Sequence, residues 1–377
     1  MANVYILIGA FLAAVILGRI IIPNILIISL RKRLFDVPDA RKVHNRPIPR
    51  LGGVTFFPVI VFTFAVTTAL RVMMNEIEYE IFTAKMACEF LFLIAGLTLL
   101  YIIGIGDDLV GVRYRKKFLV QIISASLFPI AGLYINNFYG VFGIGEIPVW
   151  IGMPFTVLLV VFITNAINLI DGIDGLASGL SMVALVIFGV IFMHYELWNF
   201  AILAFICVGV IIPFFAYNVF GNADKGRKIF MGDTGSLTLG YIISFFVIKY
   251  CMYVPGEDMQ AYGAPVVVAF SVLLVPCLDV VRVVLKRART GKALFMPDKN
   301  HIHHKFLDMG FTPRRALITI QIMSACFCAF SFIAVKHIDN TLVFVIDIVV
   351  WTLLNMWFNR VINKRKTTKN QELKIKN

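Results

Sequence analysis

Eleven apolar stretches, separated by short polar segments, run through almost the whole chain of 377 residues. A helix needs about 20 mostly apolar residues to cross the hydrocarbon core of a bilayer, and the stretches are close to this length. Only 15% of the residues are charged, against about a quarter in soluble domains. The sequence therefore predicts an all-α polytopic membrane protein with about 11 transmembrane helices. The predicted spans are 4–30, 51–73, 84–105, 119–134, 151–170, 176–193, 200–215, 236–250, 265–284, 316–335 and 342–358.

Basic residues are concentrated in every second polar segment. The rich segments are 31–50, 113–117, 225–228, 282–315 and 360–376. The intervening segments and their edges hold only Arg71, Lys85, Lys249 and Lys336. Because Lys and Arg accumulate in cytoplasmic loops, we expect the N-terminus outside and the C-terminus in the cytoplasm. We also expect one membrane-embedded domain over 1–358 and a disordered basic tail over 359–377.

The formal net charge of +13 raises the question of a nucleic-acid partner. The positive charge, however, is distributed among short loops between spans rather than gathered on one segment. Anionic lipid headgroups attract such juxtamembrane basic residues. We therefore expect no nucleic-acid partner.

Two adjacent acids, Asp107 and Asp108, follow an apolar stretch on the side rich in basic residues. Neighbouring carboxylates remain ionised together only beside a cation such as a metal ion, Lys or Arg. A turn at a helix end with solvated acids is the alternative. Arg113, Arg115 and Lys117 follow closely and could supply the positive charge.

Four oxygen-bearing side chains then recur at intervals of three residues. They are Asn165, Asn168, Asp171 and Asp174. In a regular α-helix this spacing drifts about 60° per step, so the four can share a face only if the helix tightens or breaks. Gly172 and Gly175 permit such a break. Converging oxygens suit a hard cation or sugar hydroxyls, although an interhelical hydrogen-bond ladder is the alternative.

Two further segments on the same side carry polar groups. Gly232–Ser236, written GDTGS, opens a span, and glycine-rich backbone at a helix N-terminus can present N–H groups to phosphate. Asp233 within it is a natural magnesium ligand, while a plain N-cap is the alternative. His301, His303 and His304 lie in the most basic loop, where they suit an anionic phosphate better than zinc.

Together these segments describe phosphoryl transfer at a membrane surface, a reaction that depends on positioning and electrostatic stabilisation. A secondary transporter also uses broken helices and intramembrane acids. Its binding residues, however, lie near the bilayer midplane, whereas these lie at one end of the spans. Transport is therefore the weaker alternative.

The motifs DDLVGVRYRKK, NAINLIDGIDGL, FMGDTGS and HIHH, in this order, resemble those of the polyprenyl-phosphate N-acetylhexosamine-1-phosphate transferase family. The segment from His44 to Gly53 is similar to the first cytoplasmic loop of that family. The similarity covers nearly the whole chain except the tail. It implies an enzyme of the inner (cytoplasmic) membrane with its active site on the cytoplasmic face, and it leaves a homodimer open.

The interrupted histidine motif resembles the bacterial branch that transfers N-acetylglucosamine-1-phosphate from UDP-GlcNAc to undecaprenyl phosphate. Other UDP-N-acetylhexosamines, or the phospho-MurNAc-pentapeptide donor, are the alternatives. Ile302 argues against the pentapeptide donor, because that branch usually has three consecutive histidines. The link from Asn218 to Asp233 is longer than usual for the family and leaves the role of Asn218 open.

The resemblance also implies roles for individual residues. Asp233 and Asn168 would bind Mg²⁺, for which Mn²⁺ could substitute. Asp107, supported by Asp108, would deprotonate or orient the lipid phosphate, and Lys117 would hold pyrophosphate oxygens. The donor nucleotide or sugar would be contacted by Asn165, Asp171, Asp174, Phe230 and His44. The three histidines, His301, His303 and His304, would bind phosphate or sugar.

Overall fold

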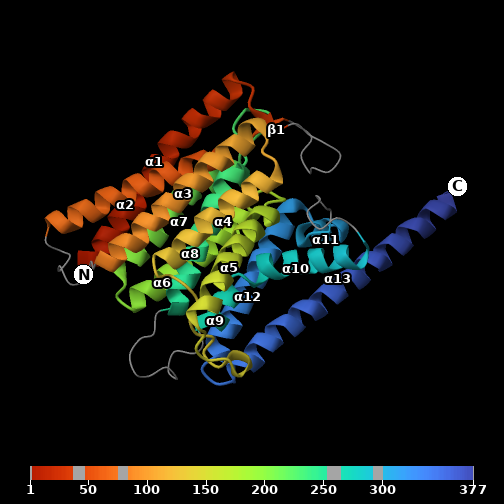
Figure 1. Ribbon diagram of the computed structural model, residues 1–377. Helices are drawn as coiled ribbons and strands as arrows, with labels where there is room; N and C mark the ends of the chain where they lie inside the picture. The colour runs from red at the N-terminus through yellow and green to blue at the C-terminus, as the bar shows by residue number, and fades with distance from the viewer. Residues whose placement is uncertain (1, 37–46, 75–83, 253–264, 292–299, 377) are drawn as a thin grey trace.

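The structure, a computed structural model, describes residues 2–36, 47–74, 84–252, 265–291 and 300–376. Within them the chain is almost entirely helical, with one pair of two-residue antiparallel strands (Figure 1). The elements are α1 (Ala2–Arg31), β1 (Phe35–Asp36), β2 (Ile48–Pro49), the 3-10 helix η1 (Gly52–Thr55), α2 (Phe56–Met73), α3 (Ala84–Val110), α4 (Tyr114–Ile130), the 3-10 helix η2 (Val141–Gly143), α5 (Val149–Ile170), α6 (Leu176–His194), α7 (Trp198–Val219), α8 (Gly232–Met252), α9 (Pro265–Val272), α10 (Leu274–Arg289), α11 (Ile302–Asp308), α12 (Pro313–Ala334) and α13 (Asn340–Lys376).

The helices confirm the expected polytopic, all-α membrane fold. Among the described residues, nine helices are long and apolar enough to cross a bilayer, and the bent pair α9 and α10 makes a tenth. The remaining expected span, 119–134, corresponds to α4, which has 17 residues. At 1.5 Å per residue α4 is about 26 Å long, which is at the short end of the range for a spanning helix.

The expected continuous span at 265–284 is instead broken between α9 and α10, which are bent by 73°. The cause is Pro276, in the first turn of α10. A proline ring clashes with the carbonyl four residues earlier and provides no N–H, and that carbonyl belongs to Val272, where α9 ends. The apolar pattern did not predict this break, because Pro276 lies inside an uninterrupted hydrophobic run.

Helix α8 lies at the centre of the bundle and packs against α3, α5 and α6. Its side chains are buried almost throughout. Aromatic rings join it to its neighbours, with Tyr241 stacked on Phe128 of α4 at a centroid distance of 4.4 Å. Phe245 meets Phe90 of α3 at 5.9 Å. Because lipid tails are as apolar as these side chains, close packing of this kind is what holds membrane helices together.

The N-terminal end of α8 is held by the chain segment that follows β2. The Phe230 N–H donates to the Pro49 carbonyl at 2.7 Å, and the Gly53 N–H donates to the Met231 carbonyl at 2.8 Å. The two backbones approach so closely that a Cβ atom on Gly53 would lie 2.2 Å from Cα of Gly235. Only glycine fits at this contact, so the first polar loop is fixed against the start of α8.

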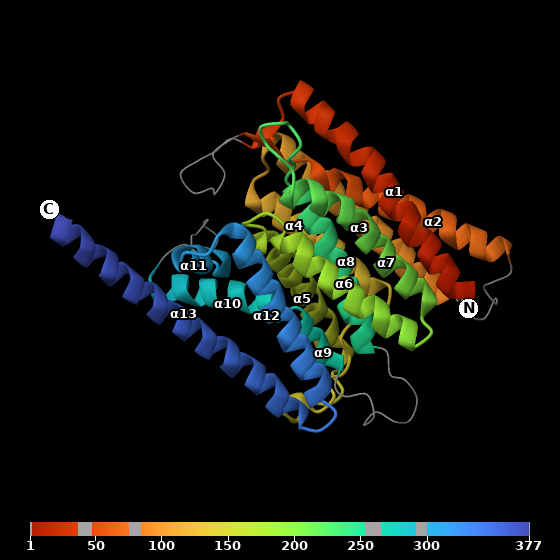
Figure 2. The same cartoon turned by 180° about the vertical axis from the view of Figure 1, so that it is seen from behind.

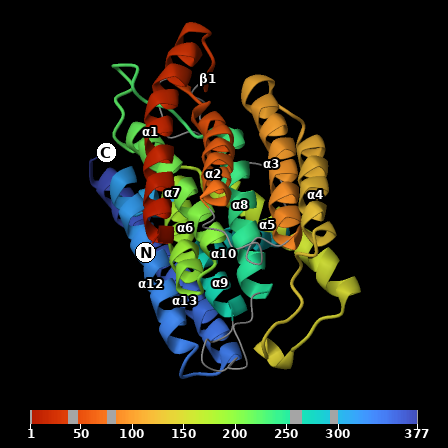
Figure 3. The ribbon, with the colours of Figure 1, turned by 90° about the vertical axis from the view of Figure 1, so that its left-hand side faces the viewer.

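Successive long helices alternate in direction, as Figures 2 and 3 show from two further sides. The C-terminal ends of α3 and α5 therefore lie at the same end of the bundle as the N-terminal ends of α4 and α8. Helix α11 lies at this end as well (Figure 1). The four polar segments that the sequence singles out are thus brought to one end of the molecule.

Residues 359–376, for which we expected a disordered tail, continue α13 as helix in the structure. This part of the chain contains neither Gly nor Pro, so nothing in it terminates a helix. It projects beyond the bundle at the end that carries α11 (Figures 1 and 2).

An ion pair joins α3 to α8 near the opposite end of the bundle. Lys249 donates to both carboxylate oxygens of Glu89, at 2.9 and 2.7 Å, and Glu89 is only 1% exposed.

Removing one partner of a buried pair leaves an uncompensated charge, which costs about 3 kcal/mol or more. We therefore expect Lys249→Met to lower the thermal stability of detergent-solubilised protein, and Glu89→Gln/Lys249→Met to regain most of the loss. Thermal unfolding measures both, and equal stability of the single and double variants would contradict the expectation.

Candidate active site

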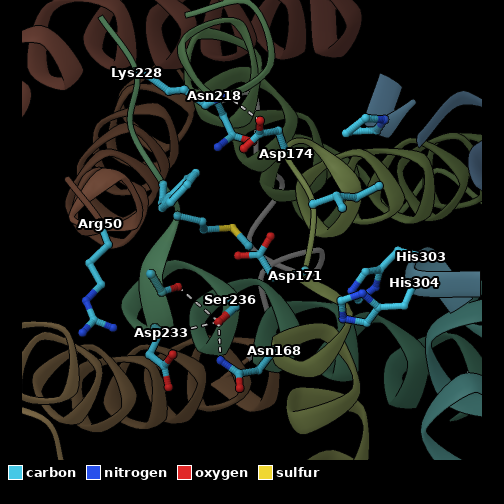
Figure 4. Close-up of a pocket in the computed structure, with 16 residues that line it drawn as sticks. Arg50, Asn168, Asp171, Asp174, Asn218, Lys228, Asp233, Ser236, His303 and His304 are labelled. Atoms are coloured by element: carbon cyan, nitrogen blue, oxygen red, sulfur yellow. Dashed lines mark hydrogen bonds and ion pairs between the residues drawn. The ribbon is translucent and has the colours of Figure 1, made fainter. Parts of the chain in front are cut away.

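A cavity of about 500 Å³ lies between the ends of α5, α7, α8 and α11 (Figure 4). His303 and His304 enter it from one side and Arg50 lies on the opposite side. The lining combines carboxylates, cations and an imidazole pair. The lining residues are Arg50, Asn168, Asp171, Gly172, Ile173, Asp174, Asn218, Lys228, Phe230, Met231, Gly232, Asp233, Ser236, His303, His304 and Pro313.

Asp108, at the end of α3, caps the N-terminus of α8. Its carboxylate accepts hydrogen bonds from the N–H groups of Asp233 and Thr234, at 2.8 and 3.0 Å, and from the Thr234 hydroxyl at 2.6 Å. The first N–H groups of a helix lack partners within the helix, and a carboxylate there also interacts favourably with the helix dipole. These two N–H groups are therefore occupied by Asp108, and Asp108 positions α8 rather than facing the cavity.

Lys117, on α4, links the neighbouring acid Asp107 to Asp233. The Lys117 ammonium pairs with Asp233 and lies 3.6 Å from Asp107. The other oxygen of Asp107 accepts the Val112 N–H at 2.6 Å. Lys117 thus provides the positive charge that the sequence predicted beside the two adjacent acids. Asp107 and Asp108 nevertheless have different roles. Asp107 lies beside the Asp233 carboxylate, whereas Asp108 holds the backbone that carries Asp233.

Asn168 and Asp233 lie on the cavity wall beside Ser236 (Figure 4). The Asn168 amide donates to the Ser236 hydroxyl at 2.7 Å, and this hydroxyl donates to the backbone carbonyls of Gly232 and Asp233, at 3.2 and 3.3 Å. Because its N–H₂ group is used in this bond, Asn168 keeps its carbonyl oxygen for another partner. The described residues hold no group of three His, Cys, Asp or Glu that could bind a metal. Mg²⁺, however, usually takes one or two protein oxygens together with water and substrate phosphate, and this donor set fits such a site.

Helix α5 ends at Ile170 and α6 begins at Leu176, so the expected helix break is confirmed. Asn218 fixes the intervening turn, because its side chain accepts the Gly175 N–H at 2.6 Å and donates to the Ile229 carbonyl at 2.8 Å. Asp174, in the turn, forms an ion pair with Lys228 at 2.5 Å. Asn218 therefore joins the turn to the segment before α8, which resolves the role that the sequence left open.

Asp171 lines the cavity, and its side chain is exposed there. Desolvation by the protein around the cavity, together with the nearby charges of Asp174, Asp233 and Asp108, raises the pKa of this carboxyl to about 7. Carboxylates that repel one another in this way bind a cation favourably. The cavity therefore favours a positively charged ion, or a ligand that brings one with it.

His303 and His304 line the cavity, and the His303 ring rests on Gly172. A Cβ atom on Gly172 would lie 2.1 Å from Nε2 of His303, so any other residue there would displace the ring. Burial, assisted by the charge of His304, lowers the pKa of His303 to about 3. His303 is therefore neutral at pH 7. It offers a hydrogen bond to a ligand rather than the positive charge that a phosphate-binding role would use.

His301 lies outside the cavity lining. It is 6% exposed, and its Nδ1 lies 2.8 Å from the Asp279 carboxylate on α10. Asn165, expected at the substrate, also lies away from the cavity and exchanges hydrogen bonds with Gln121 of α4. Phe230 does line the cavity, while His44 lies outside the described residues.

Several residues of this region were not singled out by sequence reasoning. Arg50 and Lys228 line the cavity, and Asp279 contacts the histidine segment. Arg50 and Lys228 each lie next to a motif in the sequence. Their positive charge, however, was used only to predict the orientation of the chain in the membrane. The signal for Asp279 was stronger, because an acid inside an apolar span is costly and needs a reason.

Comparison with known proteins places these residues in a family. The model of glycosyl transferase family 4 matches residues 90–251, from α3 to the end of α8. A probable undecaprenyl-phosphate N-acetylglucosaminyl 1-phosphate transferase of Bacillus subtilis is 30% identical over 319 residues, which are 84% of this chain and 82% of that protein. The undecaprenyl-phosphate alpha-N-acetylglucosaminyl 1-phosphate transferase of Escherichia coli K12 is 30% identical over 80% of this chain and 76% of its own length. The protein of that name from Yersinia pestis is 29% identical over 79% of this chain and 76% of its own length.

Identity at this level, over most of both chains, extends beyond the short motifs to the helices that carry them. The family resemblance seen in the sequence is thereby confirmed, and the chain belongs to glycosyl transferase family 4.

Proposed function

We propose that the protein transfers N-acetylglucosamine-1-phosphate from UDP-GlcNAc to undecaprenyl phosphate. The products are GlcNAc-diphospho-undecaprenol and UMP. The observation that carries the proposal is the cavity in which Asp233 and Asn168 face Arg50, Lys228 and the histidine pair. The activity named for relatives that align over most of the chain supports the same reaction.

The reaction exchanges one phosphoric anhydride for another. An oxygen of the lipid phosphate attacks the phosphorus that bears the sugar, and the bond from this phosphorus to the UMP oxygen breaks. A phosphate monoester is already largely ionised at neutral pH, so no strong base is needed. The residues act mainly by positioning and by stabilising negative charge.

The charged residues divide this work. Lys117 lies between Asp107 and Asp233 and can compensate charge on a phosphoryl group that approaches Asp233. Arg50 and Lys228 provide positive charge on the cavity wall, where the donor pyrophosphate would lie. Asp107 would hold and orient the lipid phosphate, while His304 and the neutral His303 would hydrogen-bond to the sugar or phosphate.

We propose Mg²⁺ as the cofactor, held by Asp233 and Asn168. When bound, it neutralises phosphate charge and stabilises the attacking and leaving oxygens. The gathering of Asp171, Asp174 and Asp233 around one cavity supports a cation there, because these carboxylates repel one another without one.

We further propose that the cavity faces the cytoplasm across the inner membrane, with the N-terminus outside and the C-terminus inside. The support is the concentration of basic residues at the cavity end of the bundle, since Lys and Arg mark the cytoplasmic side. Nucleotide sugars are made in the cytoplasm, and an active site at the membrane surface can reach both the soluble donor and the lipid acceptor.

The proposed reaction is tested with purified protein, Mg²⁺, undecaprenyl phosphate and a panel of UDP-sugars. We expect release of UMP and formation of lipid-linked sugar with UDP-GlcNAc, and no turnover with UDP-MurNAc-pentapeptide. Solute flux into proteoliposomes without UMP release would instead support the transporter alternative.

Asp233→Asn keeps the shape of the side chain but removes the negative charge that the metal requires. We expect UMP release to fall by about 10³-fold, at the upper end of the loss seen when one electrostatic group is removed from an active site. Chelation of Mg²⁺ should have an effect of similar size on the unaltered protein. Full activity in the presence of chelator would rule out the metal.

Asp171 gives stability a distinctive dependence on pH. Its pKa is raised to about 7 in the folded protein, whereas a carboxyl in an unfolded chain has a pKa near 3.9. Between about pH 4 and pH 7 the unfolded state loses this proton first, so stability falls as pH rises through this window. Asp171→Asn lacks the effect. In EDTA we expect the melting temperature of this variant, relative to the unaltered protein, to be higher at pH 8 than at pH 5.

Adding Mg²⁺ at pH 8 should reduce this difference, because the cation compensates the ionised Asp171. Glu89→Gln, far from the cavity, serves as the control, because the difference between its melting temperature and that of the unaltered protein should not change with Mg²⁺. A difference in melting temperature that is the same at pH 5 and pH 8 would contradict the raised pKa.

A further inference from the structure

Asp279 is a fully buried acid on α10 that none of the roles above uses. One carboxylate oxygen lies 2.8 Å from Nδ1 of His301. The other accepts the Ile302 N–H at 3.0 Å and a guanidinium N–H of Arg282 at 2.6 Å. Burying a charge without water is costly unless it is paired and hydrogen-bonded. These contacts join the carboxylate to α10 itself and to His301 and Ile302 at the start of α11.

These contacts fix the start of α11. The guanidinium of Arg282 also donates to the Asn300 carbonyl at 2.5 Å, so residues 300–302 are bound to α10 at three successive positions. Helix α11 has seven residues, far fewer than the 12–15 or so that an isolated helix needs to be even marginally stable. Its position therefore depends on tertiary contacts, of which the Asp279 carboxylate supplies two.

Helix α11 in turn carries His303 and His304 into the cavity. His303 has no hydrogen-bond partner for its buried Nδ1 among the described residues. Its ring is located by the path of α11 and by contact with Gly172. The rings of His301 and His303 are parallel, with centroids 5.9 Å apart. A shift at His301 would therefore be passed directly to His303.

We propose that Asp279 is a positioning residue for the transfer reaction, acting through His301 to hold the histidine pair against the cavity. The inference rests on the proposed function for its effect on turnover. In this proposal His301 anchors the start of α11, and only His303 and His304 contact the substrate. The three histidines of the motif thus have two different roles.

The chain offers a matched control in Asp347, on α13. This acid is also fully buried among membrane helices and accepts one hydrogen bond from the Ser331 hydroxyl at 2.7 Å. Asp347 is not among the residues that line the cavity. Asp347→Asn therefore reproduces the loss of a buried intramembrane carboxylate without touching α11.

The test compares Asp279→Asn, His301→Asn, the double variant and Asp347→Asn in purified full-length protein. A displacement of about 1 Å can reduce a rate about 100-fold. We therefore expect kcat/KM for UDP-GlcNAc to fall by about 10- to 100-fold in Asp279→Asn, and to stay near the unaltered value in Asp347→Asn. The effects of Asp279→Asn and His301→Asn should not add, because residues that act through one contact are coupled.

A second measurement does not depend on activity. Amide hydrogen exchange over residues 300–309, without substrate, should be faster in Asp279→Asn and unchanged in Asp347→Asn. If Asp279→Asn does not fold, Arg282→Gln removes one contact of the same carboxylate and should give a smaller change in the same direction.

Additive kinetic effects, equal activity losses in Asp279→Asn and Asp347→Asn, or unchanged exchange in α11 would each overturn the proposal. If the unaltered protein released no UMP, the proposed function would fail, while the exchange measurement would still test the anchor.

Discussion

The hydrogen bonds from the start of α8 to Asp108 are the interaction on which the rest of the site depends. Asp108 lies near the C-terminal end of α3 and caps the N-terminus of α8, so it fixes how far these two helices extend toward the membrane surface relative to each other. Asp233 is the residue whose N–H is capped, and its side chain therefore occupies one position with respect to Asp107 and Lys117. Packing at the glycine contact between Gly53 and Gly235 adds the first loop to the same framework. The geometry around Asp233 thus follows from the way two helix ends meet.

Charge is distributed in this protein in two ways. Near the opposite end of the bundle Glu89 and Lys249 neutralise each other fully and serve to join helices. At the cavity, in contrast, desolvation and repulsion among Asp171, Asp174, Asp233 and Asp108 raise the pKa of Asp171 to about 7. The first arrangement is stable as it stands. In the second, the repulsion between the carboxylates would be relieved by a bound cation such as the proposed Mg²⁺.

Much of the fold could be predicted from sequence, because a bilayer imposes a simple rule of length and hydropathy on each span. The break after Ile170 and the start of α8 at Gly232 followed from residue types within a few positions of each other. The bend at Pro276 was missed because hydropathy outweighed a single proline. The specific roles were harder to predict. Asn165 and Asn168 lie one turn apart in the same motif, yet one bonds to α4 and the other lines the cavity. Which way each points depends on partners far away in the chain, and a local pattern contains no information about them.

The separation of these partners along the chain affects how the protein is made. Asp108 precedes the N–H groups that it binds by 125 and 126 residues, and Glu89 precedes Lys249 by 160. Chains are synthesised from the N-terminus at about 5–20 residues per second. Each of these acids therefore exists for several seconds or more before its partner has been made. Both lie near the ends of α3 rather than in its middle, where water and headgroups can solvate them during that interval. The position of the charges thus allows α3 to enter the membrane before the helix that will neutralise it has been synthesised.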